Sequence, residues 1–337
     1  MKTEQMKVRR GMIAGVLLLF LLAGCGRTTP TGVTPTIVIP TVEATPTVTV
    51  PPASLMLVDP GGQASQAVTE SLQAFAAANG LAYVVNPDLS AEMEGVKIAV
   101  VFGDSNSYSG QAGTHPEIQF LFVGGASEGA GGNISLVSNR PQDMAFMAGY
   151  LATLVAEDWR SGGLLNAASS SAGITGDAFV NGGGYVCGRC MPVYPPYMSY
   201  PVFQDVSGKS TAAEMQADVD ALAANAVDTA FVAASAASAD LPEVLDALEL
   251  AGITPIGESA SSVNAARYAA ILGFDVQPAL AELLPKLLAG QGGESAFSRV
   301  VLVSVNDAEK IPPARRELFA QTAEALAGGW IIPLSVP

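Results

Sequence analysis

The chain has 337 residues, which exceeds one average domain and suits two. Hydrophobic residues make up 49% of it, so large buried cores can form. The formal net charge of −15 argues against nucleic acid as a partner and against adsorption to anionic lipid, because an acidic surface repels both.

The N-terminal segment predicts export and lipidation. A segment with three basic residues (7–10) precedes an apolar run (12–23), which is the order of a signal peptide. The run is too short for a membrane-spanning helix, which needs about 20 residues. It ends in Leu-Ala-Gly-Cys25, which resembles the bacterial lipobox. We therefore expect residues 1–24 to be a lipoprotein signal peptide. Cys25 would then carry lipid, palmitate included, at the extracytoplasmic face of the cell membrane. The alternative is a transmembrane anchor that ends in cysteine by chance.

Residues 25–53 are rich in Thr and Pro and almost free of charge. Prolines recur every few residues, so this segment cannot form a core and predicts an extended linker. It would hold the folded part away from the membrane surface.

The next part of the chain, residues 54–160, alternates apolar runs with amphipathic segments. Val68, Leu72 and Phe75 recur at helical spacing, and so do the apolar residues of the segment 141–157. The expected helices are 67–78 and 141–157, and the expected strands are 54–58, 81–85, 97–102 and 119–123.

Residues 161–262 repeat the same alternation. Thr211 and Glu214 have the spacing of a capping box, which marks the start of a helix. Gly252 has the position of a C-terminal helix cap. The expected strands are 163–167, 198–204, 229–233 and 253–257, and the expected helices are 178–186 and those that begin near Thr211 and Asp240.

The remaining residues, 263–337, predict helices at 278–289 and 313–327 and a strand at 299–305, followed by an apolar segment at 331–336. Repeated strand–helix–strand units imply parallel sheets covered by helices on both faces. The fold class is therefore α/β, with two doubly wound parallel-sheet lobes. We expect lobe 1 at 54–160, completed by part of 263–337, and lobe 2 at 161–262.

Polar side chains follow several predicted strands. Ligands of open α/β sheets lie at the carboxyl ends of strands, which makes Asp59, Ser105 and Glu258 the preferred ligand contacts. Gln63 lies in the loop after Asp59, and Phe102 offers an aromatic face, so both join the expected ligand-binding residues. The alternative is that the polar residues cap the following helices and that Phe102 belongs to the core.

Cys187 and Cys190 form a CxxC motif. A redox pair needs its first cysteine at a helix N-terminus, where the thiol pKa is lowered. Here the motif follows a predicted helix, so we favour a structural disulfide over a thiol oxidoreductase. No cluster of His, Cys and carboxylate residues has the spacing of a metal site, and no phosphate-binding or catalytic motif occurs. We expect no enzyme activity, cofactor or metal.

Several segments of the chain share one resemblance. They are two predicted helical segments, 144–154 (MAFMAGYLATL) and 178–182 (AFVNG), a strand at 251–257 (AGITPIG) and the ending 328–337 (GGWIIPLSVP). The preceding residues 116–123 (PEIQFLFV) and 133–134 also fit. These segments resemble the basic-membrane-protein family of substrate-binding lipoproteins, which includes purine nucleoside receptors.

The resemblance implies a type 1 periplasmic-binding-protein fold with two lobes joined by a hinge. A small polar ligand would be captured between them by hinge closure and delivered to an ABC permease. Known members often bind nucleosides. The sequence departs from the family's ligand motifs at 59–65 (DPGGQAS) and 257–262 (GESASS). A receptor of the same fold that senses a ligand without transport is the alternative.

Overall fold

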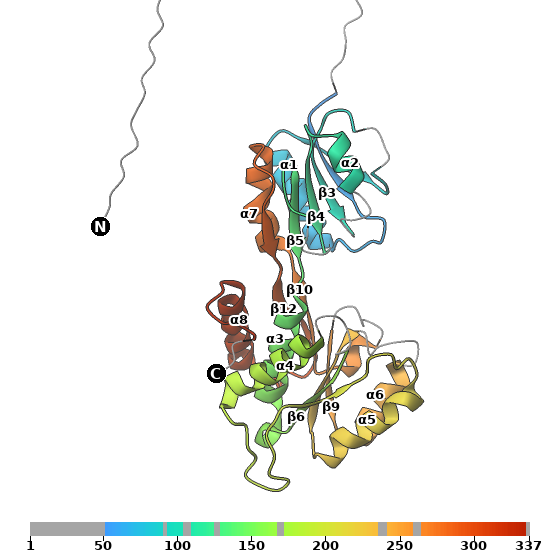
Figure 1. Cartoon of the computed structure of the whole chain (residues 1–337), viewed down its shortest axis with the longest axis vertical. Helices are drawn as coiled ribbons and strands as arrows, with labels where there is room; N and C mark the ends of the chain where they lie inside the picture. Colours follow the sequence, from blue (N-terminus) through green and yellow to red (C-terminus); the bar gives the residue numbers. More distant parts are fainter. Residues whose placement is uncertain are drawn as a thin grey trace, which may run out of the picture. The chain divides into compact units, whose positions relative to one another are not determined.

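The computed structural model describes residues 51–89, 93–103, 109–124, 129–166, 172–234, 241–258 and 264–334. The expected signal peptide, Cys25 and nearly all of the linker lie outside these residues. The prediction of two parallel-sheet α/β lobes is confirmed, because the described residues form two six-stranded sheets with helices on both faces (Figure 1).

The first sheet is parallel throughout and has the order β11-β5-β4-β3-β1-β2. Helices α1 and α7 cover one face and α2 packs on the other. The strands are β1 (Ser54–Val58), β2 (Ala82–Asn86), β3 (Val96–Phe102), β4 (Gln119–Val123), β5 (Ile134–Ser138) and β11 (Ser295–Phe297). The helices are α1 (Gln66–Ala78), α2 (Ser109–Thr114) and α7 (Gln277–Leu288).

The central strands of this sheet are buried on both faces, which explains why β1, β3 and β4 are largely apolar. Leu55 and Leu57 of β1 belong to the cluster under α1 and α7, whereas Met56 and Val58 belong to the opposite cluster. Successive strand residues point to opposite faces, so a strand covered on both sides needs apolar residues at every position.

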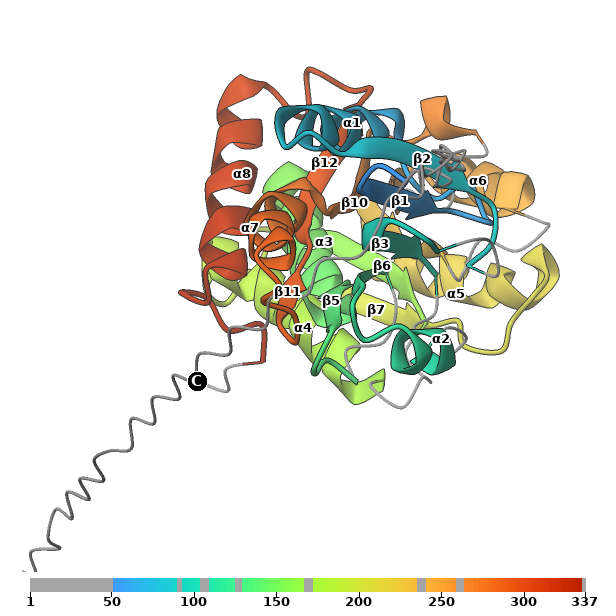
Figure 2. The ribbon, with the colours of Figure 1, turned by 90° about the horizontal axis from the view of Figure 1, so that it is seen from above.

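The second sheet has the order β12-β10-β9-β8-β6-β7, and only β12 runs antiparallel to its neighbour. Figures 1 and 2 show α5 and α6 on one side of it, and α3, α4 and α8 on the other. The strands are β6 (Ser161–Leu165), β7 (Val202–Asp205), β8 (Thr229–Val232), β9 (Thr254–Glu258), β10 (Ala270–Asp275) and β12 (Arg299–Val305). The helices are α3 (Pro141–Val155), α4 (Ala172–Cys187), α5 (Ala212–Ala224), α6 (Leu241–Leu250) and α8 (Pro313–Ala327).

Three chain segments pass from one sheet to the other lobe: β5 continues into α3, β10 into α7, and β11 into β12. Side-chain and backbone contacts hold these segments together. Ser298 donates its backbone N–H to the carbonyl oxygen of Ser138 at 3.1 Å. Arg299 forms an ion pair with Asp275 at 3.3 Å. The crossing segments are therefore the hinge between the lobes.

Several elements differ from the sequence-based expectation. Strands β5, β10 and β11 are not predicted from the sequence, and β7 begins at Val202 instead of residue 198 because the loop before it runs through Tyr200 and Pro201 without pairing. Helix α4 begins six residues earlier than expected, at Ala172. The predicted capping box of α5 is confirmed: Thr211 Oγ1 accepts from the Glu214 N–H at 3.3 Å, and the Glu214 carboxylate accepts from the Thr211 N–H at 3.0 Å.

Candidate functional site

A cavity of about 750 Å³ lies at the carboxyl ends of the strands of the first sheet. Phe102 ends β3 there, and Asn139 directly follows β5. The cavity also reaches the hinge, because the end of β10 and the start of α7 line it. The lining residues are Gly61, Gly62, Gln63, Ser65, Val68, Phe102, Val123, Gly124, Asn139, Phe274, Asp275, Val276 and Gln277.

The loop after β1 presents Gln63 to this cavity. Asp59 holds the loop in place, since its two carboxylate oxygens accept from the backbone N–H groups of Gln63 and Ala64, both at 2.8 Å. Gly62 has a φ of +62°, a left-handed conformation that favours glycine. Ser65 then caps α1 by accepting from the Val68 N–H at 3.3 Å. Asp59 therefore orders the loop, and Gln63 is the side chain offered to a ligand.

A second cavity of about 300 Å³ lies at the carboxyl ends of the strands of the second sheet. It is mostly apolar, with a few polar groups at the strand ends. Its lining residues are Pro141, Met144, Ala145, Leu165, Asn166, Thr175, Phe231, Ala233, Ala234, Glu258 and Phe274.

Glu258 is the charged residue of the second cavity. It ends β9, and its Oε2 accepts from the Ala234 N–H at 2.9 Å. Burial raises the pKa of this carboxyl above its usual value, and the hydrogen bond from Ala234 opposes the shift only in part. A desolvated carboxylate at the edge of a cavity can hold a group that donates hydrogen bonds or carries positive charge.

Phe274 belongs to both cavities. It lies on the hinge strand β10, next to Asp275, whose carboxylate pairs with Arg299 and accepts from the Gln277 N–H at 3.0 Å. The two cavities therefore meet at an aromatic ring carried by a segment that connects the lobes.

The structure places the residues predicted from the sequence as follows. Gln63 and Phe102 line the first cavity, Glu258 lines the second, and Asp59 supports the loop of Gln63. Ser105 lies outside the described residues. Sequence reasoning missed Phe274, Asn139 and Asn166, because the first two lie on crossing segments that it did not assign. The apolar run 269–274, which is followed by Asp275, was the signal that could have located β10.

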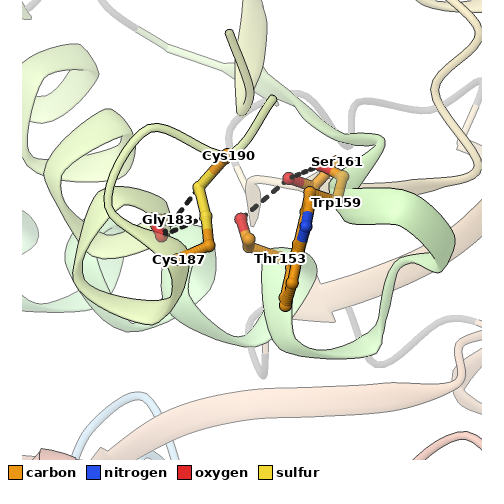
Figure 3. The surroundings of a disulfide bond; sticks show 6 residues. All are labelled: Thr153, Trp159, Ser161, Gly183, Cys187 and Cys190. Carbon is orange, nitrogen blue, oxygen red and sulfur yellow. Dashed lines mark hydrogen bonds between the residues drawn. A yellow bond between two sulfur atoms is a disulfide. The ribbon is translucent and has the colours of Figure 1, made fainter. Parts of the chain in front are cut away.

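Cys187 and Cys190 form a disulfide at the C-terminal end of α4 (Figure 3). Both sulfur atoms lie within 3.5 Å of the Gly183 carbonyl oxygen, and Cys190 is buried. The C-terminus of a helix disfavours a thiolate, whereas redox motifs use the N-terminus. The position of the motif thus disfavours a thiol oxidoreductase.

Two features are absent from the part of the chain that the structure describes. Within the described ranges, no group of three or more His, Cys, Asp or Glu residues has the arrangement of a metal site. Among those same residues, no helix combines the length and the hydropathy that a bilayer crossing requires.

The sequence matches no protein-family model and no curated protein. Solved structures with a similar fold were found. An ABC transporter solute-binding protein from Conexibacter woesei DSM 14684 has a TM-score of 0.55 at 16% identity, covering 85% of this chain and 98% of that one. A transcriptional activator of the comK gene from Bacillus halodurans has a TM-score of 0.55 at 16% identity, covering 84% of this chain and 100% of that one. An ABC transporter solute-binding protein from Aeropyrum pernix K1 has a TM-score of 0.50 at 14% identity, covering 84% and 93%. At these identities the likeness shows the fold alone: the chain has the two-lobed α/β architecture of periplasmic binding proteins.

Proposed function

We propose that this protein is an extracytoplasmic solute-binding lipoprotein that captures a small polar solute by hinge closure and delivers it to an ABC importer. The observation that carries the proposal is the pair of cavities at the carboxyl ends of both sheets, joined at Phe274 of the hinge. Closure around this ring would bring the polar groups of both lobes onto one solute.

The chemistry of the two cavities supports small-molecule binding. Phe102, Phe231 and Phe274 provide apolar faces, and Gln63, Asn139, Asn166 and Glu258 provide a few polar groups at strand ends. Ligand sites in proteins commonly combine apolar walls with a small number of polar groups that fix orientation.

Transport follows from the resemblance and from the N-terminal sequence. Lipid on Cys25 and the Thr/Pro-rich linker would tether the binding domain at the outer face of the membrane, where an ABC permease could receive the solute. The resemblance to the basic-membrane-protein family makes nucleosides the first solutes to test.

A thermal-unfolding screen of nucleosides, sugars, amines and amino acids tests solute capture. A bound solute stabilises the folded state by about 2.7 kcal/mol at 100 times its Kd, so a true ligand raises the Tm with its concentration. Gln63→Ala should weaken that shift. Gln73→Ala on the exposed face of α1, outside both cavities, is the matched control and should leave it unchanged. A panel that produces no shift would contradict solute capture.

A ligand-sensing receptor without transport is the second candidate. It is favoured by the transcriptional activator of the comK gene from Bacillus halodurans, which has the same fold. Uptake of the identified ligand by cells that carry or lack the protein separates the two functions. Loss of uptake in the deletion supports the importer, and unchanged uptake supports the receptor.

A further inference from the structure

The charged residues that line the two cavities are acidic. The first contains one charged residue, Asp275, and the second contains one, Glu258. Among the described residues, neither cavity is lined by Lys, Arg or His. A solute with a carboxylate or phosphate group would therefore enter this site without a positive partner.

The basic residues of the hinge are already paired with other groups. Arg140 binds Asp143 at 2.5 Å and lies over the Phe297 ring at 4.4 Å from its centroid. Arg299 binds Asp275 at 3.3 Å. The charge of Asp275 is thus compensated within the protein, whereas Glu258 has no ion pair with a residue that the structure describes.

We propose that the solute is a cation, such as a protonated amine, without an acidic group, and that Glu258 is its counter-charge. This inference rests on the proposed function and names the class of solute. Glu258 is half-buried in the ligand-free protein, and a solute that covers the cavity would bury it further. A charge that is buried without a partner loses its hydration without compensation. A cationic solute would provide the missing partner of Glu258, whereas a neutral solute would cover the carboxylate and leave it unpaired.

Solutes that share a carbon frame and differ in charge test this inference. Glucosamine, glucose and glucuronic acid form one such set, and 1,5-diaminopentane, 1,5-pentanediol and glutaric acid form another. Calorimetric titration of the purified full-length chain at fixed ionic strength should show at least tenfold tighter binding of a cationic member than of its neutral analogue, and no binding of the acidic one.

Two variants with the same charge change separate a direct role of Glu258 from a general effect of protein charge. Glu258→Gln should reduce the preference for the cation at least tenfold. Glu243→Gln, on the exposed part of α6 and outside both cavities, should leave this preference unchanged.

Equal or tighter binding of neutral or acidic members would overturn the cation inference while supporting solute capture. If no solute of any charge bound, the proposed function itself would be contradicted.

Discussion

At the scale of single residues, two acidic side chains at the carboxyl ends of β1 and β9 have different roles. Asp59 satisfies two backbone N–H groups of its own loop, so its carboxylate is already used for local structure. Glu258 has one oxygen on the Ala234 N–H and lies at a cavity wall. Both residues lie at the end of a strand, but their contacts differ. Asp59 has a structural role, whereas Glu258 is a candidate for ligand binding.

Glu258→Gln should raise the Tm of the ligand-free protein at neutral pH. Burial raises the pKa of Glu258 in the folded state above the value of 4.5 for an unperturbed glutamate. As pH rises through the interval above 4.5, the unfolded state releases this proton first, so the wild-type protein loses stability there. Glutamine carries no charge, and its amide oxygen can still accept from the Ala234 N–H.

The measurement is the Tm of both proteins from pH 4 to pH 8. The advantage of Glu258→Gln should be small at the acidic end and grow toward neutral pH. Glu243→Gln is exposed and should stay within about 0.5 kcal/mol of the wild-type protein. A Tm of Glu258→Gln at or below that of the wild-type protein at pH 7 would show that the carboxylate is not penalised by burial.

At the scale of elements, glycines determine how closely α3 and α4 approach each other. A Cβ atom at Gly182 would lie 1.9 Å from the carbonyl oxygen of Phe146, and one at Gly149 would lie 1.9 Å from that of Phe179. Each helix therefore uses a glycine to accommodate the backbone of the other. The helix pair forms a large part of the buried core of the second lobe, which includes Met147 and Leu151.

Gly182→Ala should destabilise the protein by about 1–3 kcal/mol or more, because the helices must separate to admit the methyl group. Gly184→Ala is the matched control two residues further along α4. A Cβ atom there has no neighbour within 4 Å, so alanine should be neutral or stabilise the helix by roughly 0.5–1 kcal/mol. Chemical denaturation measures both variants. Equal effects of the two substitutions would argue against this close helix packing.

The sequence predicts those elements whose signal is local. Helix α1 follows from the spacing of Val68 and Leu72, and β1 follows from an unbroken apolar run. Strand β11 has only three residues and no strand signal of its own. It exists because it pairs with β5, and the Leu136 N–H donates to the Glu294 carbonyl oxygen at 2.9 Å. Such pairing joins residues far apart in the chain, which local periodicity cannot show.

The candidate site could be predicted only in part for the same reason. Phe102 and Glu258 end strands with clear local signals, and Gln63 lies in the loop after such a strand. All three line a cavity. Phe274 and Asn139 lie on hinge segments, and their position depends on how the chain crosses between the sheets. The central residue of a site that two lobes share can therefore be located only from the tertiary structure.

At the scale of the whole molecule, the solute-binding proposal requires that the two lobes be tethered to a membrane without being inserted in it. Among the described residues, no helix is suited to crossing a bilayer. The proposed attachment is a lipid near the N-terminal end of the chain. The chain has three cysteines, and two of them form the disulfide of α4. The third cysteine, Cys25, is the proposed lipid site.

In a bacterial host that processes lipoproteins, the wild-type protein should incorporate labelled palmitate and enter the detergent phase of a Triton X-114 separation. Cys25→Ser should abolish the label and move the protein to the aqueous phase, because acyl chains contribute about 0.8 kcal/mol of membrane affinity per buried CH₂ group. The double variant Cys187→Ser, Cys190→Ser removes the other two thiols and should behave as the wild-type protein. A Cys25→Ser protein that stayed in the detergent phase without label would instead indicate that the apolar run 12–23 is itself a membrane anchor.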